Sequence, residues 1–435
     1  MSQRPTRSLS VITKLEQSLG WTLALIISLM PIHAFMSVWL GSLTGHQAVI
    51  QSWKEVALIA MTAATLVLVA LSKTHRDRLK SPWIYAALAY IAVSGIVTLI
   101  TMPEFKLVVF GAKINLEFIV AAMIAWVVAT PALARRLVTA VLAGCAVVVI
   151  FGLMQIIALP PDFLTHFGYG PDTILPYQRI AEGTNTLRFP STLGGPNQLG
   201  SYLILPICLI IALAWQKRYR WLLALGAIAL VCLIGTHSRS AWVGTLIAAS
   251  VAAVAGAPAR IKRRVIYAVM GLAVASALAV PAIIATDSDL QYYVLHSSIE
   301  NHDRSDLSNG QHVQSLEDGT EATASQPFGH GLGTAGPATF QTATPNIIEN
   351  YYLQLSYEVG VLGLIAFMFT IILLGRKLWL AGTPLAQATA LSFLGVGIIC
   401  LLLPAWTDST TALIAWICAG SAAAPWAKQL EQSRV

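Results

Sequence analysis

The sequence has few charged residues. Only 11% of its 435 residues are Asp, Glu, Lys or Arg, whereas soluble domains carry about 25%. So small a share cannot cover a surface that faces water, which excludes an ordinary soluble protein. Apolar residues make up 56% of the chain and occur in long continuous runs. A membrane β-barrel requires alternation instead, so the runs indicate helices that cross a lipid bilayer.

Cysteine is also scarce, and its placement excludes the usual cysteine chemistry. The five cysteines lie inside apolar runs without a Cys-x-x-Cys pair: Cys145, Cys208, Cys232, Cys400 and Cys418. They are typical of packing residues, so we expect neither a disulfide nor a metal site. No paired carboxylates typical of glycosidases stand out in the sequence. We therefore expect metal-independent group transfer without a cofactor.

Twelve apolar segments approach the length of about 20 residues that a bilayer core of about 30 Å requires. They are residues 20–40, 56–72, 82–101, 116–131, 136–158, 197–215, 220–236, 240–257, 264–285, 350–374, 384–403 and 409–425. We expect an all-α polytopic membrane protein, one integral membrane domain over residues 1–435, with about 12 transmembrane helices. The first segment is long enough to remain as a helix, so no cleavable signal peptide is expected.

The basic residues predict the orientation of these helices. Twenty of the 27 lysines and arginines lie at the two termini or in loops on the same side as the termini. Basic residues concentrate on the cytoplasmic side of membrane proteins, so both termini are predicted to be cytoplasmic. The net charge of +7 therefore indicates orientation rather than affinity for nucleic acid.

Seven basic residues break this rule and fall at or near the outer face: Lys54, Lys106, Lys113, Arg179, Arg188, Arg239 and Arg304. Two outer loops are also long, at residues 159–196 and 286–349, the second between the ninth and tenth predicted helices. Loops of this length are usually functional or disordered. We therefore expect the chemistry at the outer face.

The second outer loop contains Gly331-x-Gly333-x-x-Gly336, a pattern of dinucleotide-binding turns. That fingerprint requires a preceding strand and a βαβ unit, and the sequence predicts neither. We interpret Gly331 and Gly333 as parts of a tight loop with exposed backbone N–H groups, which could face a phosphate.

Two arginines stand next to predicted helix starts. Arg188 precedes a Gly-Gly-Pro-Asn turn that ends at Asn197 and opens a helix, and helix N-termini attract anions. Arg239 lies in a tight turn with His237, almost at membrane depth, where a charge usually has a function. His237 itself is more simply an interface histidine. Arginine pairs with phosphate through two hydrogen bonds at once.

The second outer loop adds further candidates. Arg304 and His312 lie in a polar stretch, and Glu349 and Asn350 lie where the loop enters a helix. Three arginines and a base suit a diphosphate leaving group and the deprotonation of an attacking hydroxyl. Alternatively, Glu349 only complements the dipole of the helix that follows it.

On these segments the sequence resembles the O-antigen ligase/polymerase superfamily of bacterial inner-membrane glycan transferases. The motifs are Arg188 to Asn197, Ser238-Arg239-Ser240, the glycine run from Pro327 to Gly333, and Glu349-Asn350-x-Tyr352-Leu353 running into Glu358. The resemblance implies a fold similar to the C-type membrane glycosyltransferases. It also implies transfer of a glycan from undecaprenyl diphosphate on the periplasmic side. The diphosphate-binding candidates are then Arg188, Arg239 and Arg304, supported by Asn197, Asn350, Gly331 and Gly333.

One position departs from the family pattern. Ligases of the family typically carry His-Asn where this chain has Glu349-Asn350, and that histidine is regarded as the base. Here either Glu349 or His312 would be the base, and Arg239 would complete the catalytic set. The Glu-Asn form and the glycine run look more like the polymerase and exopolysaccharide branch.

The resemblance therefore predicts a polymerase, whose acceptor is another lipid-linked glycan. The alternative is a ligase that transfers the glycan to lipid A core. A lipid-linked glycan flippase or transporter is the alternative of another class, although the sequence shows no internal repeat. A scaffold protein of envelope assembly is a third. Expected partners are the undecaprenyl-diphosphate-linked glycan, the acceptor, membrane lipids and, as candidates, envelope polysaccharide assembly proteins.

Overall fold

The structure, a computed structural model, describes residues 4–180, 186–216, 219–286, 314–317 and 319–424. The first half contains α1 (Arg4–Thr44), α2 (Gln47–Gln51), α3 (Trp53–Leu71), α4 (Lys73–Arg78), α5 (Pro82–Thr101), α6 (Phe105–Val127), α7 (Pro131–Ile157), η1 (Phe163–Phe167), β1 (Gln178–Arg179) and β2 (Leu187–Arg188). The second half contains α8 (Pro196–Ala214), α9 (Leu222–Gly235), α10 (Arg239–Gly256), α11 (Ala259–Thr286), η3 (Gly336–Gln341), α14 (Tyr351–Ala381), α15 (Pro384–Ile399), η4 (Ala405–Thr407) and α16 (Ser409–Ala422).

Each of the twelve segments predicted to cross the membrane overlaps a helix. Within the described residues, eight helices are long and apolar enough to do so: α1, α3, α5, α6, α7, α8, α10 and α14. The helices α9, α15 and α16 are apolar but shorter, with 14, 16 and 14 residues. The prediction of an all-α polytopic membrane protein is confirmed, and the count of 12 spans stays a prediction.

Two predicted segments begin well after the start of their helices: residue 20 lies in α1, which begins at Arg4, and residue 116 lies in α6. The segment predicted to begin at residue 116 belongs to α6, which begins at Phe105. Lys106 and Lys113 therefore lie within a helix rather than in a loop. Their charges interrupt the apolar run from which the boundary was predicted. The loop predicted at residues 159–196 is also more ordered than a connector, because it contains η1 and the hairpin of β1 and β2.

Local chemistry explains where several helices begin. α5, α7, α8 and α15 each have proline in the first turn, where the missing N–H costs nothing. Four helices are capped by a side-chain oxygen that accepts a backbone N–H of the first turn, from Thr130 at α7, Asn350 at α14, Thr383 at α15 and Asp408 at α16. These signals fix the helix starts.

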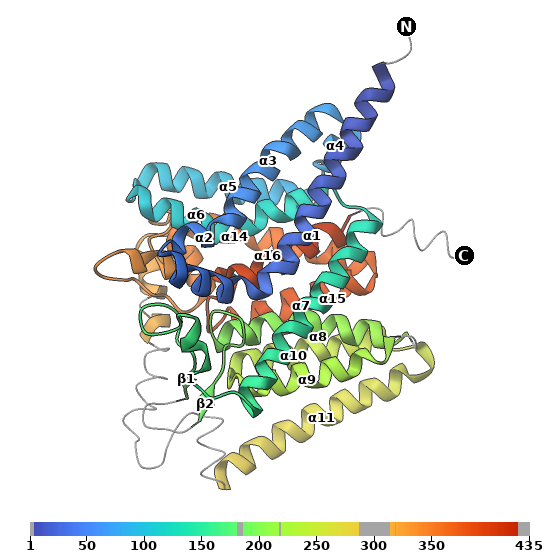
Figure 1. Cartoon of the computed structure of the whole chain (residues 1–435), viewed down its shortest axis with the longest axis vertical. Coiled ribbons are helices and arrows are strands. Elements are labelled where there is room, and N and C mark those ends of the chain that lie inside the picture. The colour runs from blue at the N-terminus through green and yellow to red at the C-terminus, as the bar shows by residue number, and fades with distance from the viewer. Residues whose placement is uncertain (1–3, 181–185, 217–218, 287–313, 318, 425–435) are drawn as a thin grey trace.

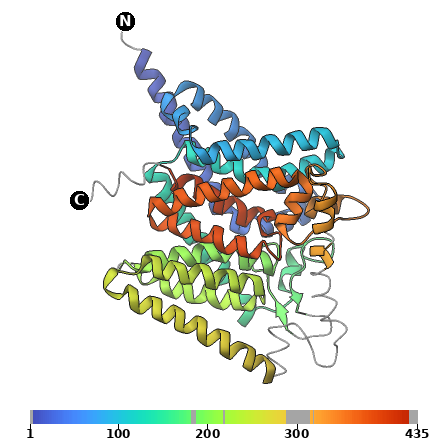
Figure 2. The same ribbon diagram turned by 180° about the vertical axis from the view of Figure 1, so that it is seen from behind.

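Helix α16 forms the centre of the bundle. All residues from Thr410 to Ala422 are buried within the protein, and both views show other helices around it (Figures 1 and 2). A Cβ at Gly420 would overlap the backbone of Ala122 in α6. Trp416 packs against Phe118 of α6, with ring centroids 5.0 Å apart. The core is therefore built on a short helix that other helices shield from lipid.

The ends of the helices form two distinct faces. In Figure 1 the start of α1, the helix α4 and the connection from α10 to α11 lie at one end of the bundle. The hairpin of β1 and β2 and the orange segment that contains η3 lie at the opposite end, and Figure 2 shows the same separation from behind. The strongly basic segments and the segments with candidate functional residues are therefore at opposite ends.

A buried ionic cluster joins α3 to α6. The Lys54 side chain is only 1% exposed, and its Nζ lies 2.5 Å from Glu55 Oε1. The same carboxylate oxygen lies 2.7 Å from Nζ of Lys113 in α6. Burying a charge is costly unless it is paired, so Glu55 compensates two cations at once. Two of the basic residues that break the charge rule thus have a structural explanation.

Loss of the Glu55 charge removes the carboxylate that Lys54 and Lys113 share. We expect Glu55→Gln to reduce the free energy of unfolding by roughly 3–5 kcal/mol, which is typical when one partner of a buried pair is removed. A melting curve of the purified protein in detergent measures this loss. Asp77→Asn is the control, because it breaks an exposed pair with Lys80, and should leave the melting temperature nearly unchanged. Equal melting temperatures for both variants would contradict the assignment.

Candidate functional site

A short hairpin carries the first candidate residue. β1 pairs antiparallel with β2 so that Gln178 lies opposite Arg188, and directly opposite residues share a face of the ribbon. The Arg188 guanidinium donates from Nε to the carbonyl oxygen of Thr236 and from Nη2 to Oδ1 of Asn197, each at 2.7 Å. One side chain thereby connects the hairpin, the end of α9 and the start of α8.

A tight turn places the second arginine. α9 ends at Gly235 and α10 begins at Arg239. Between them His237 has φ +50°, a left-handed conformation that costs about 1–2 kcal/mol for a residue with a Cβ. Thr236 Oγ1 accepts the N–H of Ser238 at 3.1 Å and stabilises the turn. The chain therefore reverses within three residues and leaves Arg239 in the first turn of α10.

The N-terminal parts of α8 and α10 lie side by side. Gly200 of α8 faces Ala241 of α10 so closely that a Cβ on the glycine would overlap the alanine side chain. Helix N-termini carry partial positive charge because their first N–H groups lack helical acceptors. Arg188 is bonded to the second residue of α8, and Arg239 is the first residue of α10. Two helix N-termini and two guanidinium groups therefore add positive charge at one place.

The electrostatics of this place favour an anion. Burial lowers the pKa of Arg188 to about 10, and the positive charge of Arg239 contributes to the shift. No carboxylate in the described part of the chain forms an ion pair with Arg188. Burial, and then the charge of Arg188, also lower the pKa of His237. A partly buried guanidinium whose hydrogen bonds go to neutral oxygens is typical of a site for an anionic ligand.

The predicted residues Glu349 and Asn350 stand at the start of α14. Asn350 Oδ1 accepts the N–H groups of the second and third residues after it, at 2.9 and 3.0 Å. Its Nδ2 donates to the carbonyl oxygen of Leu401 at 2.9 Å. Glu349 is partly buried, and its N–H donates to Oγ of Ser315 at 3.1 Å. Asn350 therefore fixes the start of α14 and with it the backbone that carries Glu349.

The structure thus brings Arg188, Asn197 and Arg239 together and gives Asn350 a capping role. Two other predicted residues, Arg304 and His312, lie outside the described residues. Their roles in binding diphosphate and in accepting a proton stay predictions, as does the role of Glu349 as a base.

The glycine run fits into a break of helix α14. Gly360 has φ +73° and ψ 172°, which interrupts the helix. The carbonyl oxygens of Tyr357 and Glu358 there accept the N–H groups of His330 and Gly331, at 2.9 and 2.8 Å. The His330 ring also stacks on the Tyr357 ring, with centroids 3.9 Å apart. Backbone N–H groups of the loop thus donate hydrogen bonds to carbonyl oxygens at the break of the helix.

The expectation that this loop exposes its N–H groups to a phosphate is wrong. Gly331 and Gly333 are both buried and have φ of +98° and +82°. A Cβ at Gly333 would overlap the carbonyl group of Leu107 in α6, and the N–H of Leu332 donates to Oγ1 of Thr98 at 3.1 Å. The glycines are needed because the loop packs directly against helix backbones, so the run supports the fold.

Glu358 holds the same loop from inside the bundle. Its side chain is buried, and Oε2 accepts Nδ2 of Asn115 in α6 at 2.5 Å. Oε1 accepts the N–H of Ala335 at 3.4 Å, and the backbone of Gly333 and the side chain of Gln354 hydrogen-bond to the same carboxylate. This carboxylate therefore links α6, α14 and the glycine loop.

Two contributors to the arginine site escaped the sequence analysis. Thr236 acts through its backbone carbonyl, which no side-chain pattern reveals. Gln178 shares a ribbon face with Arg188 only because two-residue strands pair, and strands this short show no alternation. The polar turn around Arg239 between two apolar runs was the one available signal for Thr236.

Comparison with known families gives a match over part of the chain. Residues 224–368 match the family model of the O-antigen ligase. This region is similar to the O-antigen ligase domain. The resemblance to the O-antigen ligase/polymerase superfamily is thereby confirmed, and the domain supports a glycan-transferring enzyme of ligase or polymerase type.

The matched region extends from α9 into α14 and covers about a third of the chain. It includes Arg239, Glu349 and Asn350, whereas Arg188 and Asn197 precede it. A search of curated proteins finds no significant match to this chain.

The glycine loop can be tested through its closest contact. We expect Gly333→Ala to destabilise the protein by at least about 2 kcal/mol, because the new Cβ adds backbone strain and overlaps a helix carbonyl. Thermal unfolding of the purified protein measures the loss. Gly170→Ala is the matched control, since a Cβ there meets nothing within 4 Å, and it should unfold like the unaltered protein. If the two variants unfolded alike, the packing role would be refuted.

Proposed function

We propose that this protein transfers a glycan from undecaprenyl diphosphate to a sugar hydroxyl at the periplasmic face of the bacterial inner membrane. It would act as an O-antigen or exopolysaccharide polymerase. The observation that carries the proposal is the placement of Arg188 and Arg239 at the adjacent N-terminal parts of α8 and α10. A diphosphate leaving group gains negative charge as its bond to the sugar breaks, and preorganised cations stabilise that charge.

The reaction forms one bond and breaks one. The acceptor hydroxyl oxygen bonds to the anomeric carbon of the donor glycan, while the bond between that carbon and the diphosphate oxygen breaks. The electron pair of the broken bond stays on the diphosphate, where Arg188 and Arg239 stabilise it. The hydroxyl proton passes to Glu349, with His312 as the alternative base. The scheme requires neither a metal ion nor a cofactor.

The arrangement of the helix ends supports the periplasmic placement. The hairpin that carries Arg188 lies at the end of the bundle opposite α4 and the connection from α10 to α11. These two segments are rich in lysine and arginine, which mark the cytoplasmic side. In this orientation both termini are cytoplasmic, and the arginine site faces lipid-linked donors on the outer side.

The residue pair Glu349-Asn350 supports a polymerase. Ligases of the superfamily typically carry histidine where this chain has Glu349, so the chain departs from the ligase pattern at the proposed base. The acceptor would then be another undecaprenyl-diphosphate-linked glycan. A ligase that uses lipid A core as the acceptor is the alternative within the same chemistry.

A lipid-linked glycan transporter is the candidate of another class. The cluster of Lys54, Glu55 and Lys113 lies in membrane-spanning helices, where ionisable groups often mark a transport path. Glu55 pairs with both lysines, which supports a structural role for the cluster and favours the enzyme. Solute accumulation in proteoliposomes that depends on an ion gradient would support the transporter instead.

Reconstitution distinguishes these functions. Purified protein in liposomes receives undecaprenyl-diphosphate-linked repeat units without lipid A core, and the products are separated on a gel. A ladder of longer glycans is the result expected of a polymerase. Transfer that begins only after addition of lipid A core would assign a ligase, and the absence of both products would contradict glycan transfer.

The arginine pair should be essential for turnover. We expect Arg188→Ala and Arg239→Ala each to lower the transfer rate at least about 100-fold, as removal of one group that stabilises transition-state charge does. Arg179→Ala is the control, because Arg179 is exposed on the opposite face of the same hairpin, and it should retain most activity. Melting curves show whether each variant is folded, and folded Arg188→Ala and Arg239→Ala variants with full activity would refute the proposal.

The base can be assigned by comparing two substitutions. If Glu349 takes the proton, Glu349→Gln should lower the transfer rate by about 10²–10⁴-fold while His312→Ala has little effect. The opposite pattern would assign the base to His312. Initial rates with saturating donor measure both, and two fully active variants would show that neither group is the base.

A further inference from the structure

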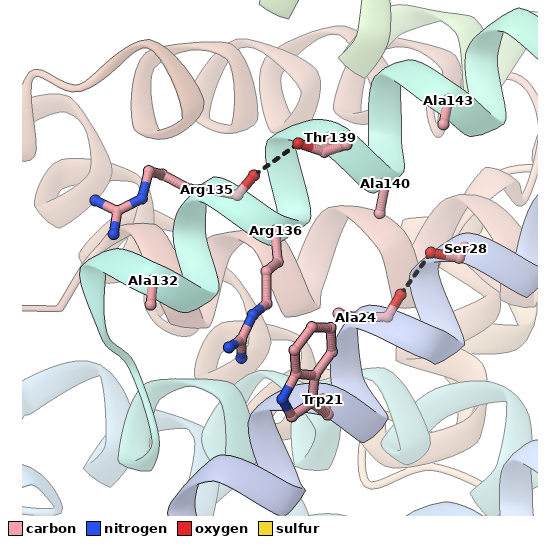
Figure 3. A pocket seen from close by; sticks show the side chains of 9 residues that line it. All are labelled: Trp21, Ala24, Ser28, Ala132, Arg135, Arg136, Thr139, Ala140 and Ala143. Atoms are coloured by element: carbon pink, nitrogen blue, oxygen red, sulfur yellow. Dashed lines mark hydrogen bonds between the residues drawn. The ribbon is translucent and has the colours of Figure 1, made fainter.

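A groove lies between α1 and α7, away from the arginine site. Its volume is about 560 Å³, and it is open along one side. Figure 3 shows the two helices that flank it, with the residues that line it. Arg78 of α4 donates to the carbonyl oxygens of Val127 and Ala129, just before α7 begins. The groove therefore starts at the same end of the bundle as α4, which is opposite to the hairpin.

The chemistry of the groove changes along its length. At the first turns of α7 stand Arg135, which is exposed, and Arg136, whose Cζ lies 3.7 Å from the ring centroid of Trp21 in α1. Figure 3 shows Arg136 reaching over the Trp21 ring. Farther along, the walls are small and mostly apolar and include Ala140 and Ala143. One end of the groove is therefore cationic, and the rest suits a hydrocarbon chain.

The positive charge of this end is not compensated within the groove. In the parts of the chain that the structure describes, no carboxylate forms an ion pair with Arg135 or Arg136. The Trp21 side chain is 59% exposed, as expected for an aromatic residue at a membrane interface. From Arg136 to Ala143 the helix rises by about 10 Å, which is the depth from the phosphate level into the acyl region.

We propose that this groove binds an anionic phospholipid of the leaflet next to α4. The lipid phosphate pairs with Arg135 and Arg136, and one acyl chain lies along the alanines of α1 and α7. Basic pockets between membrane helices recognise anionic head groups in this way. A free phosphate ion would use only the cationic end, whereas a phospholipid fills the apolar part as well. The site does not depend on the proposed transfer reaction, because it lies at the other end of the bundle.

Lipid binding to the purified full-length protein tests this site. Native mass spectrometry in a neutral detergent counts the lipids retained after addition of phosphatidylglycerol, phosphatidylethanolamine or inorganic phosphate. We expect preferential retention of phosphatidylglycerol, which the double variant Arg135→Gln/Arg136→Gln weakens at least about tenfold. Arg260→Gln/Arg263→Gln is the matched control, because it removes two exposed charges next to the α10–α11 connection at the same end and should bind as the unaltered protein does.

A second pair of variants tests the apolar part without changing charge. Ala143→Phe fills the groove and should weaken retention of phosphatidylglycerol by a similar factor. Ile150→Phe, on an exposed part of α7 outside the groove, should not. Equal loss in the arginine control would show general charge attraction and overturn the site. Equal retention of phosphatidylethanolamine, full competition by inorganic phosphate, or unchanged binding by Ala143→Phe would also overturn it.

Discussion

The two hydrogen bonds of the Arg188 guanidinium hold the candidate site together. They join a hairpin, the last turn of α9 and the first turn of α8, three segments that are separated in the chain by up to 48 residues. Arginine has five N–H donors, and these bonds use only the Nε group and one from Nη2. The remaining donors, next to the charge of Arg239, suit a ligand with several anionic oxygens. The diphosphate that we propose as the leaving group is such a ligand.

A second constraint fixes the outer ends of α5, α6 and α14. The break at Gly360 and the glycine loop depend on each other, because the carbonyl oxygens at the break accept N–H groups of the loop. The Glu358 carboxylate hydrogen-bonds to the loop from inside the bundle, and Asn115 connects this carboxylate to α6. The glycine run therefore has a packing role. It fixes the framework at the outer end of α14, the helix whose start follows Glu349.

The helices could be predicted from sequence because each apolar run suffices to predict a helix in a membrane. The start of α6 could not be predicted in this way, because Lys113 interrupts the apolar run. Its partner Glu55 is far away in the chain. The arginines were found because a charge at membrane depth is costly. The residues that contact these arginines were not predicted, because no sequence pattern reveals a contact through the backbone carbonyl of Thr236. The glycine pattern was misinterpreted because its role depends on a helix break at Gly360 that only the structure reveals.

The most direct test of this account is the affinity of the purified protein for undecaprenyl diphosphate without a glycan, compared with undecaprenyl monophosphate. The account predicts tighter binding of the diphosphate, and loss of that preference in a folded Arg188→Gln/Arg239→Gln variant, because the two guanidinium groups are placed for the second phosphate. Equal affinity of the unaltered protein for both lipids, or a preference that survives in the variant, would contradict it.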